Sequence, residues 1–216
     1  MEKAKVLEAI RKAKEAKKRN FKQTFDIIVK LKDLDLKKPE QNLDFFALLH
    51  YPIGRKAKVC ALVGAEMRDA ATQAVDKVII QDEFARYGQD KKATKKLAEE
   101  YDYFIAQANI MPAIATHFGK ILGVRGKMPN PKAGCVVSPN ANLKQLYEKL
   151  QKTVRVKTRN SQMVQARIGY EDQPEEEIAD NIITLHTQIV NHLVNHENNI
   201  SKTLLKLTMG APVEIK

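Results

Sequence analysis

The sequence has no tryptophan, only two cysteines, and few aromatic residues, which make up 6% of the chain. Cys60 and Cys135 are isolated and no Cys-x-x-Cys pair occurs, which excludes a disulfide framework and a cysteine zinc site and favours a reducing compartment. No apolar run reaches the roughly 18 residues of a membrane span, and the N-terminal MEKAKVLEAIRKAKEAKK lacks the apolar core of a secretion signal. These absences predict a cytoplasmic protein without a membrane partner.

Acidic residues are also in deficit. The 26 Asp and Glu stand against 37 Lys and Arg, which gives a formal net charge of +11 on 216 residues. Solubility explains a few units of charge, but a surplus of this size favours a nucleic acid as partner, because Lys and Arg release counterions when they neutralise phosphates. The apolar content of 44% suffices for one large or two modest domains.

The middle of the chain, residues 57–153, alternates short apolar segments with amphipathic ones. This pattern predicts a parallel sheet with helices on both faces, a three-layer, Rossmann-like α/β domain. Residues 1–56 and 154–216 are each small for an independent core, so we expect them to form together a split α+β domain that carries the middle as an insertion. The predicted fold class is therefore α/β with two domains, joined by two chain crossings that form a hinge.

Local patterns predict the elements of the split domain. Residues 1–19 have helical apolar spacing, and residues 24–32 alternate as a strand. The segments TVRVKTR and QMVQARI, separated by Asn160 and Ser161, are typical of a β-hairpin. A helix is predicted from YEDQPEEEIADNI through LHTQIVNHLVNH, and the terminal SKTLLKLTMGAPVEIK favours a strand.

Residues 123–134, GVRGKMPNPKAG, combine three glycines, two prolines and three cations without an acid. The Gly-Lys pair is followed by Met128, which excludes a Walker phosphate loop, and the glycines lack the spacing of a dinucleotide fingerprint. Pro129 and Pro131 also remove two N–H donors that a phosphate cradle would use. We expect a rigid loop that presents its cations at little entropic cost: Arg125, Lys127 and Lys132.

This loop resembles the signature loop of the family of large-subunit ribosomal protein one, the protein of the mobile ribosomal stalk. Two further blocks agree in order: Phe21-Lys22-Gln23-Thr24 matches the family's Phe-x-x-Thr element, and Thr208-Met209-Gly210 matches its Thr-Met-Gly triplet. Lys127 and the acidic YEDQPEEEIADNI segment are similar to archaeal members, whereas Val124 and Cys135 depart from the usual proline and the bacterial threonine. The split-domain layout matches over essentially the whole chain.

The resemblance implies a structural protein of the large ribosomal subunit, with no enzymatic activity, cofactor or metal. It implies that the split domain binds rRNA, that the stalk contacts exit-site tRNA, and that the protein represses its own mRNA, as many members do. The protein would be a monomer within the ribosome. Two alternatives stay open: an assembly factor that leaves the mature subunit, and a nucleotide-dependent enzyme built on the central domain, which rests on fold analogy alone.

The RNA-binding residues are expected at both ends of the chain and on the cationic strands. Phe21 and Met209 fit a core equally well by sequence alone, but the family uses such side chains against RNA. Period-two alternation separates cations from apolar residues in the two strand segments, and no acid interrupts the six cations between Lys149 and Arg167. The predicted set is Phe21, Lys22, Thr24, Arg155, Lys157, Arg159, Arg167, Lys206, Thr208, Met209 and Gly210.

Catalytic and metal-binding patterns are weak. His192 and His196 have the i, i+4 spacing of two ligands on one helical turn, but no third ligand accompanies them and the zinc-protease motif is absent. We expect these histidines on a helix surface or against a partner. No Ser-His-Asp, Cys-His or paired-carboxylate arrangement is visible.

Overall fold

A computed structural model describes residues 1–15, 17, 19–35, 38, 41–158 and 161–215. The chain forms two compact units: Met1–Arg55 with Lys152–Lys216, here called the split unit, and Lys56–Gln151, here called the inserted unit. Each unit has a hydrophobic core of its own. The mixed α/β class predicted from the sequence is confirmed.

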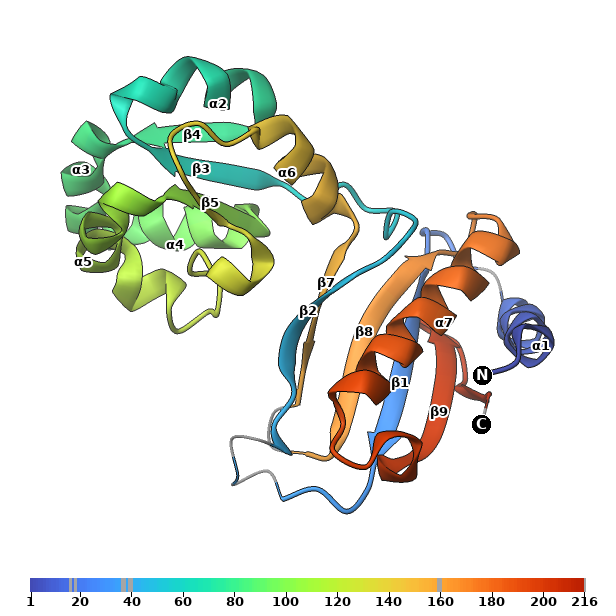
Figure 1. Cartoon of the computed structure of the whole chain (residues 1–216). Helices are drawn as coiled ribbons and strands as arrows, with labels where there is room; N and C mark the ends of the chain where they lie inside the picture. The colour runs from blue at the N-terminus through green and yellow to red at the C-terminus, as the bar shows by residue number, and fades with distance from the viewer. Residues whose placement is uncertain (16, 18, 36–37, 39–40, 159–160, 216) are drawn as a thin grey trace. The chain divides into compact units, whose positions relative to one another are not determined.

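The split unit is built on an antiparallel sheet of order β10-β9-β1-β8. Its strands are β1 (Thr24–Leu31), β8 (Met163–Tyr170), β9 (Ile200–Leu207) and β10 (Val213–Glu214). The predicted alternation of β1 is confirmed, since Phe25, Ile27 and Val29 are buried. Helices α1 (Lys3–Lys14) and α7 (Glu175–His192) cover this buried face (Figure 1). The opposite face of the sheet carries the charged side chains.

The predicted hairpin between the two cationic segments is wrong. Strand β7 (Thr153–Lys157) pairs antiparallel with β2 (Asp44–Leu48), and β8 pairs with β1. The apolar run around Phe45 supplies β7 with a partner whose inward residues enter the same core as Val154 and Val156. A local turn signal was outweighed by this burial, because long-range packing contributes more than the preference of a two-residue connection.

The inserted unit has a parallel sheet of order β4-β3-β5-β6. Its strands are β3 (Val59–Val63), β4 (Lys77–Ile80), β5 (Tyr103–Gln107) and β6 (Val136–Val137). Every residue of β3 is buried, as expected for a central parallel strand. Helices α2 (Arg68–Ala74) and α6 (Leu143–Gln151) cover one face, and α3 (Phe84–Gln89), α4 (Lys91–Glu100) and α5 (Met111–Leu122) cover the other (Figure 1).

Helix termini follow the charge pattern of the sequence. The side chain of Asp90 caps α4 by accepting hydrogen bonds from the N–H groups of Lys92 and Ala93. Helix α7 begins after Pro174 with three glutamates in its first turn, where the helix dipole favours negative charge. It ends at His192, earlier than the predicted continuation through His196.

Candidate nucleic-acid interface

Segments from the N-terminal and C-terminal parts of the chain meet where β1 begins and β9 ends. The N–H of Thr24 donates to Oγ1 of Thr208 (3.1 Å), and the two hydroxyls lie 3.0 Å apart. The N–H of Thr208 donates in turn to the carbonyl of Thr24 (3.1 Å). The structure thus brings the Phe-x-x-Thr and Thr-Met-Gly blocks, 184 residues apart, into direct contact.

Phe21 and Met209 are exposed side chains beside this junction. Phe21 is 50% and Met209 is 59% exposed, so neither belongs to the core. One exposed apolar side chain is common on a protein surface, but several close together are informative, because grouped apolar surface marks a site that a partner covers. We call the surface formed by Phe21, Thr24, Thr208 and Met209 the terminal platform.

Gly210 closes the turn that carries Met209. Its N–H donates to the carbonyl of Leu207 (2.9 Å), and an added Cβ would lie 3.2 Å from the Leu207 Cβ. A larger residue there would need Leu207 to shift slightly, so the tightness of the turn favours glycine whether or not a ligand approaches it. Lys22, beside the platform, pairs with Asp172 at 2.7 Å.

Two cations flank the open face of β1. Arg167 on β8 and Lys206 on β9 both lie opposite Asp26 in the strand register. No ion pair among the described residues involves either cation, and their effect on Asp26 is electrostatic only. Burial raises the pKa of Asp26, and the two cations oppose that rise. Sequence reasoning missed Asp26, although its place in the polar half of the strand pattern was a signal.

Two hollows line the same face of the split unit. One is lined by Asp26, Ile28, Gln165, Ala166, Arg167 and Lys206. The other is lined by Arg155, Lys157, Ser161, Met163 and Gln165. Since Gln165 borders both, the two hollows adjoin along β8. Together they extend from the open face of the sheet to strand β7 of the β2–β7 pair.

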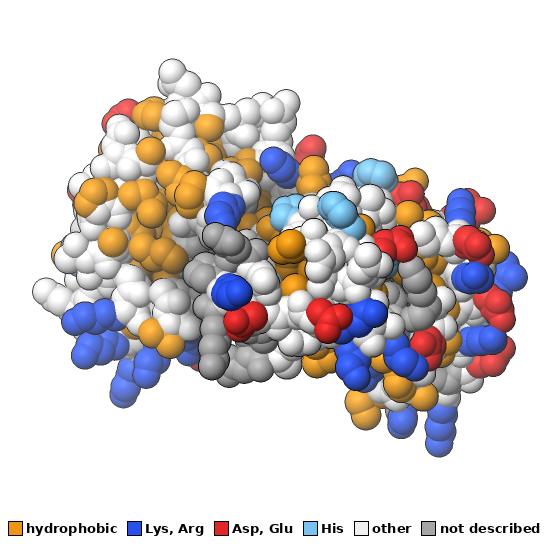
Figure 2. All heavy atoms as spheres, turned by 60° about the horizontal axis from the view of Figure 1, so that its bottom comes forward, with side chains coloured by type: hydrophobic (Ala, Val, Ile, Leu, Met, Phe, Trp, Pro, Cys, Tyr) orange, Lys and Arg blue, Asp and Glu red, His pale blue; other side chains and the backbone are white. Residues whose placement is uncertain are grey.

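The cations of β7 are balanced by an acid that lies far away in the sequence, outside the acid-free stretch from Lys149 to Arg167. Asp44 on β2 receives a bidentate pair from Arg155, with both N···O distances 3.0 Å, and lies 3.4 Å from Lys157. The Arg155 guanidinium lowers the pKa of Asp44 and also lies 5.5 Å from the centre of the Phe46 ring. On the face drawn in Figure 2, Lys and Arg side chains also lie beside Asp and Glu side chains. Arg159 lies outside the described residues.

The basic loop of the inserted unit has internal partners. The Lys127 ammonium donates to the carbonyls of Ala98 (2.8 Å) and Tyr101 (2.7 Å) at the end of α4, and Arg125 pairs with Glu99 (2.8 Å). Lys132 is exposed in a 3-10 turn, η5 (Pro131–Ala133), and Val124 is 90% exposed. Of the three cations that we expect the loop to present, Arg125 and Lys127 have partners within the inserted unit, and the Lys127 ammonium holds the loop against the end of α4.

A buried glutamine occupies the switch point of the sheet in the inserted unit. In such sheets a ligand phosphate binds between the carboxyl ends of the two central strands, here β3 and β5. That place is filled by Gln107, which is 1% exposed and accepts a hydrogen bond from the N–H of Gly64 (2.9 Å). The backbone donor that a phosphate would use is therefore occupied, which disfavours the enzyme alternative.

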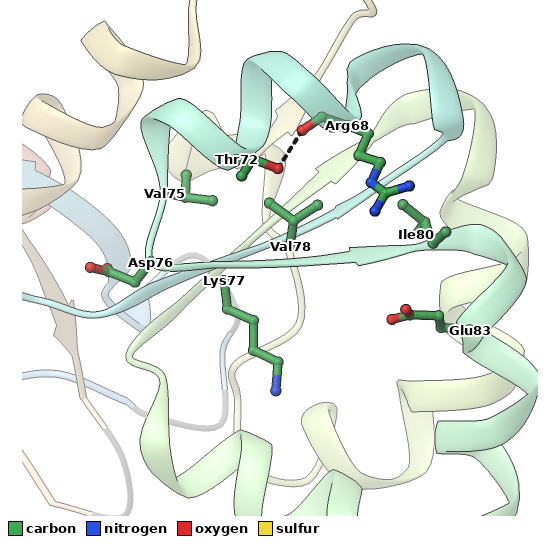
Figure 3. A pocket seen from close by; sticks show the side chains of 8 residues that line it. All are labelled: Arg68, Thr72, Val75, Asp76, Lys77, Val78, Ile80 and Glu83. Carbon is green, nitrogen blue, oxygen red and sulfur yellow. Dashed lines mark hydrogen bonds between the residues drawn. The ribbon is translucent and has the colours of Figure 1, made fainter.

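A pocket at the β4 edge does not replace this crevice. Figure 3 shows Arg68 and Thr72 of α2 above Val78, with Lys77 pointing to the other side of the strand. The Thr72 hydroxyl donates to the Arg68 carbonyl (2.8 Å). Asp76 and Glu83 lie among the cations of the lining, so the pocket has no concentrated positive field for a phosphate.

Of the remaining candidate side chains, His192, Cys60 and Cys135 have packing or burial that explains their positions. The ring of His192 stacks on Phe45 (centroids 3.8 Å apart), and His196 lies beyond the end of α7. Burial raises the pKa of the Cys60 thiol to about 12 and that of Cys135 to about 11, so neither is a thiolate at neutral pH. Within the described ranges, no group of three or more His, Cys, Asp or Glu is placed to hold a metal. Nor does any described helix have the length and apolar character to span a membrane.

Comparison with known proteins identifies the family. The model of the ribosomal protein L1p/L10e family matches residues 13–211. Large ribosomal subunit protein uL1 of Pyrococcus abyssi is 39% identical over 214 residues, covering 98% of this chain and 95% of its own. The uL1 proteins of Nanoarchaeum equitans (39% over 213 residues, 97% and 98% covered) and Methanothermococcus thermolithotrophicus (37% over 217 residues, 100% of both) are similar in extent.

These organisms are archaea, which agrees with the archaeal character of Lys127 and the acidic segment. The relatives are named as ribosomal proteins, and the family is structural rather than enzymatic. The resemblance seen in three short sequence blocks thus extends over nearly the full length. The chain belongs to the ribosomal protein L1p/L10e family.

Proposed function

We propose that the chain is an rRNA-binding protein of the large ribosomal subunit, located on the ribosome in the cytoplasm. The observation that carries this proposal is the terminal platform, in which exposed Phe21 and Met209 lie beside two hydrogen-bonded threonines. The names of the relatives and the net charge of +11 support the same partner. The split unit is then the RNA-binding domain, and the inserted unit its Rossmann-like insertion.

The platform and its flanks offer three kinds of contact. Phe21 and Met209 can cover bases and sugars, which removes apolar surface from water. The hydroxyls of Thr24 and Thr208 can bond 2′-hydroxyl groups, the feature that separates RNA from DNA. Arg167 and Lys206 can supply charge for phosphates without first breaking an ion pair to any residue that the structure describes. Arg155 and Lys157 can do so only in competition with Asp44.

We also propose the finer roles that the family resemblance implies. The protein would form part of a mobile stalk that contacts exit-site tRNA, with the chain crossings near 53–56 and 152–155 as a hinge. The RNA-binding domain would also repress translation of its own mRNA. Contacts to shape and backbone do not distinguish two RNAs folded alike, so one surface can serve both. Feedback follows if rRNA binds more tightly than the mRNA.

Substitutions in the platform test the assignment. Met209→Asp and Thr208→Ala should each weaken binding to an rRNA fragment by about 1–3 kcal/mol, as for the loss of one specific contact. Lys92→Gln and Lys96→Gln, on the exposed side of α4, should change binding little. Filter binding measures all four, and thermal melting separates a lost RNA contact from the lost hydrogen bond between Thr24 and Thr208.

The reverse ranking, in which the α4 lysines matter more than the platform, would show that the site is misplaced. Resident and transient roles are distinguished by salt-washed large subunits. A ribosomal protein stays bound to them, whereas an assembly factor is absent.

A further inference from the structure

Gln23 lies beneath the terminal platform and joins its two halves. Its side chain is buried, with the residue only 1% exposed, so it does not face a ligand. The Oε1 atom accepts a hydrogen bond from the N–H of Met209 (3.1 Å), and Nε2 donates to Oε2 of Glu171 (3.3 Å). The other carboxylate oxygen of Glu171 accepts from the N–H of Gln23 (3.2 Å), and the Glu171 N–H donates to the Gln23 carbonyl (3.1 Å).

At neutral pH these bonds favour an amide at position 23. The atom facing Met209 must accept, because a backbone N–H can only donate, and the atom facing Glu171 must donate, because a carboxylate only accepts. Leucine would satisfy neither partner, and an ionised glutamate would satisfy only Met209. The arrangement also fixes which way the amide points, since the flipped amide would oppose like groups on both sides.

We propose that Gln23, oriented by Glu171, is a positioning residue for the RNA site. It holds the turn that carries Met209 at a set distance from Phe21 and Thr24, so that the apolar and hydroxyl contacts are in place before RNA arrives. Preorganisation of this kind raises affinity because less ordering is left to occur on binding. The inference rests on the proposed RNA-binding function and adds a supporting pair, buried Gln23 and half-buried Glu171, behind the residues proposed to contact RNA.

An exchange of the two side chains tests the proposal. Gln23→Glu places a second carboxylate against Glu171, and repulsion should displace the Met209 turn and weaken binding of the rRNA fragment about 10- to 100-fold at pH 7.5. Gln23→Glu with Glu171→Gln restores every bond. The two backbone N–H groups still donate to side-chain oxygens, and only the bond between the two side chains changes direction, with the amide of residue 171 now donating to the carboxylate of residue 23. The double variant also restores the net charge. We expect this double variant to bind within about threefold of the unmodified protein.

The dependence on pH separates positioning from a general loss of stability. Two facing carboxylates raise each other's pKa, so in Gln23→Glu one of them should hold a proton as the pH falls towards 5. The protonated oxygen can then donate, and the binding defect should shrink, whereas the double variant should show no such recovery. Asn20→Asp is the matched control, because it adds the same charge at an exposed position next to Phe21. Glu171→Gln should not rescue it selectively.

Two results would overturn the inference alone, provided that the unmodified protein binds and melting shows folded variants. One is undiminished affinity in Gln23→Glu. The other is a double variant as weak as the single one. Failure of the unmodified protein to bind the rRNA fragment would instead overturn the proposed function, and this inference with it.

Discussion

Asp44 shows how a single residue changes the meaning of a cationic segment. The strand around Arg155 has no acid in its own sequence neighbourhood, yet the fold sets Asp44 opposite it and forms a bidentate pair. A side chain held in this way is oriented as well as neutralised, because the guanidinium fork has one favourable geometry towards a carboxylate. Arg155 is therefore positioned over Phe46 by Asp44 and is not freely available to phosphate.

Asp44→Asn should lower stability in a pH-dependent way. The Arg155 guanidinium lowers the pKa of Asp44 in the folded state, so the unfolded chain binds this proton more readily. The stabilisation is present above the unfolded pKa of about 4 and is lost as the pH falls through the lower folded value. In urea unfolding, the unmodified protein should have a higher free energy of unfolding than Asp44→Asn at pH 7, and this difference should shrink towards pH 3. A difference that stays constant with pH would contradict this account.

Lys127→Met should destabilise the inserted unit. The ammonium bonds two carbonyls at the end of α4, where backbone acceptors have no partner within the helix. A hydrogen bond that involves a charged group contributes about 1.5–3 kcal/mol, so losing both bonds should lower the free energy of unfolding by at least about 1.5–3 kcal/mol. Lys132→Met, at an exposed position on the same loop, is the control and should have little effect. Equal melting temperatures for both variants would refute the capping role of Lys127.

Among the elements, the segment that follows β2 depends on one glycine. Gly54 has φ of +97°, and a Cβ at this position would overlap the ring of Tyr170 at the end of β8. Gly54→Ala therefore combines backbone strain with a steric clash and should cost about 1–3 kcal/mol. Adding Tyr170→Ala should recover only the part due to the clash, as chemical denaturation of both variants would show.

The matched control is a glycine in a helix. Gly119 lies within α5, and nothing is within 4 Å of an added Cβ. Gly119→Ala should stabilise the chain by about 0.5–1 kcal/mol, because alanine has the higher helix propensity. A loss of stability there would show that replacing glycine is harmful for reasons other than the backbone and the Tyr170 ring.

The elements also show what sequence patterns could and could not predict. The predicted alternation of buried and exposed faces in β1, β7 and β8 is confirmed, because the apolar residues that alternate along each strand are the buried ones. The pairing of β7 with β2 was not predictable from a turn signal, because it depends on which distant apolar segment completes the core. The site follows the same rule. Phe21 and Met209 are predicted from short motifs, whereas the contacts of Asp44, Gln23 and Glu171 join remote segments of the sequence.

At the scale of the whole molecule, the net charge of +11 leaves open which cations meet a partner. Total charge acts through a long-range field and raises the rate of encounter with any polyanion. Specific phosphate contacts differ, because each releases bound counterions and adds to the dependence of affinity on salt. The salt dependence of binding therefore counts contacts that net charge alone does not locate.

We expect Arg167→Gln and Lys206→Gln to flatten the salt dependence of rRNA binding, and Lys92→Gln to leave it unchanged. The slope of log affinity against log salt concentration should fall by on the order of 0.7–0.9 for each phosphate contact removed. All three variants lose one positive charge, so a difference between them reflects position and not total charge. Binding titrations of the rRNA fragment at KCl concentrations from about 50 to about 300 mM give the three slopes. If all three variants reduce the slope equally, binding depends only on the total charge of the protein. That result would contradict direct phosphate contacts by Arg167 and Lys206.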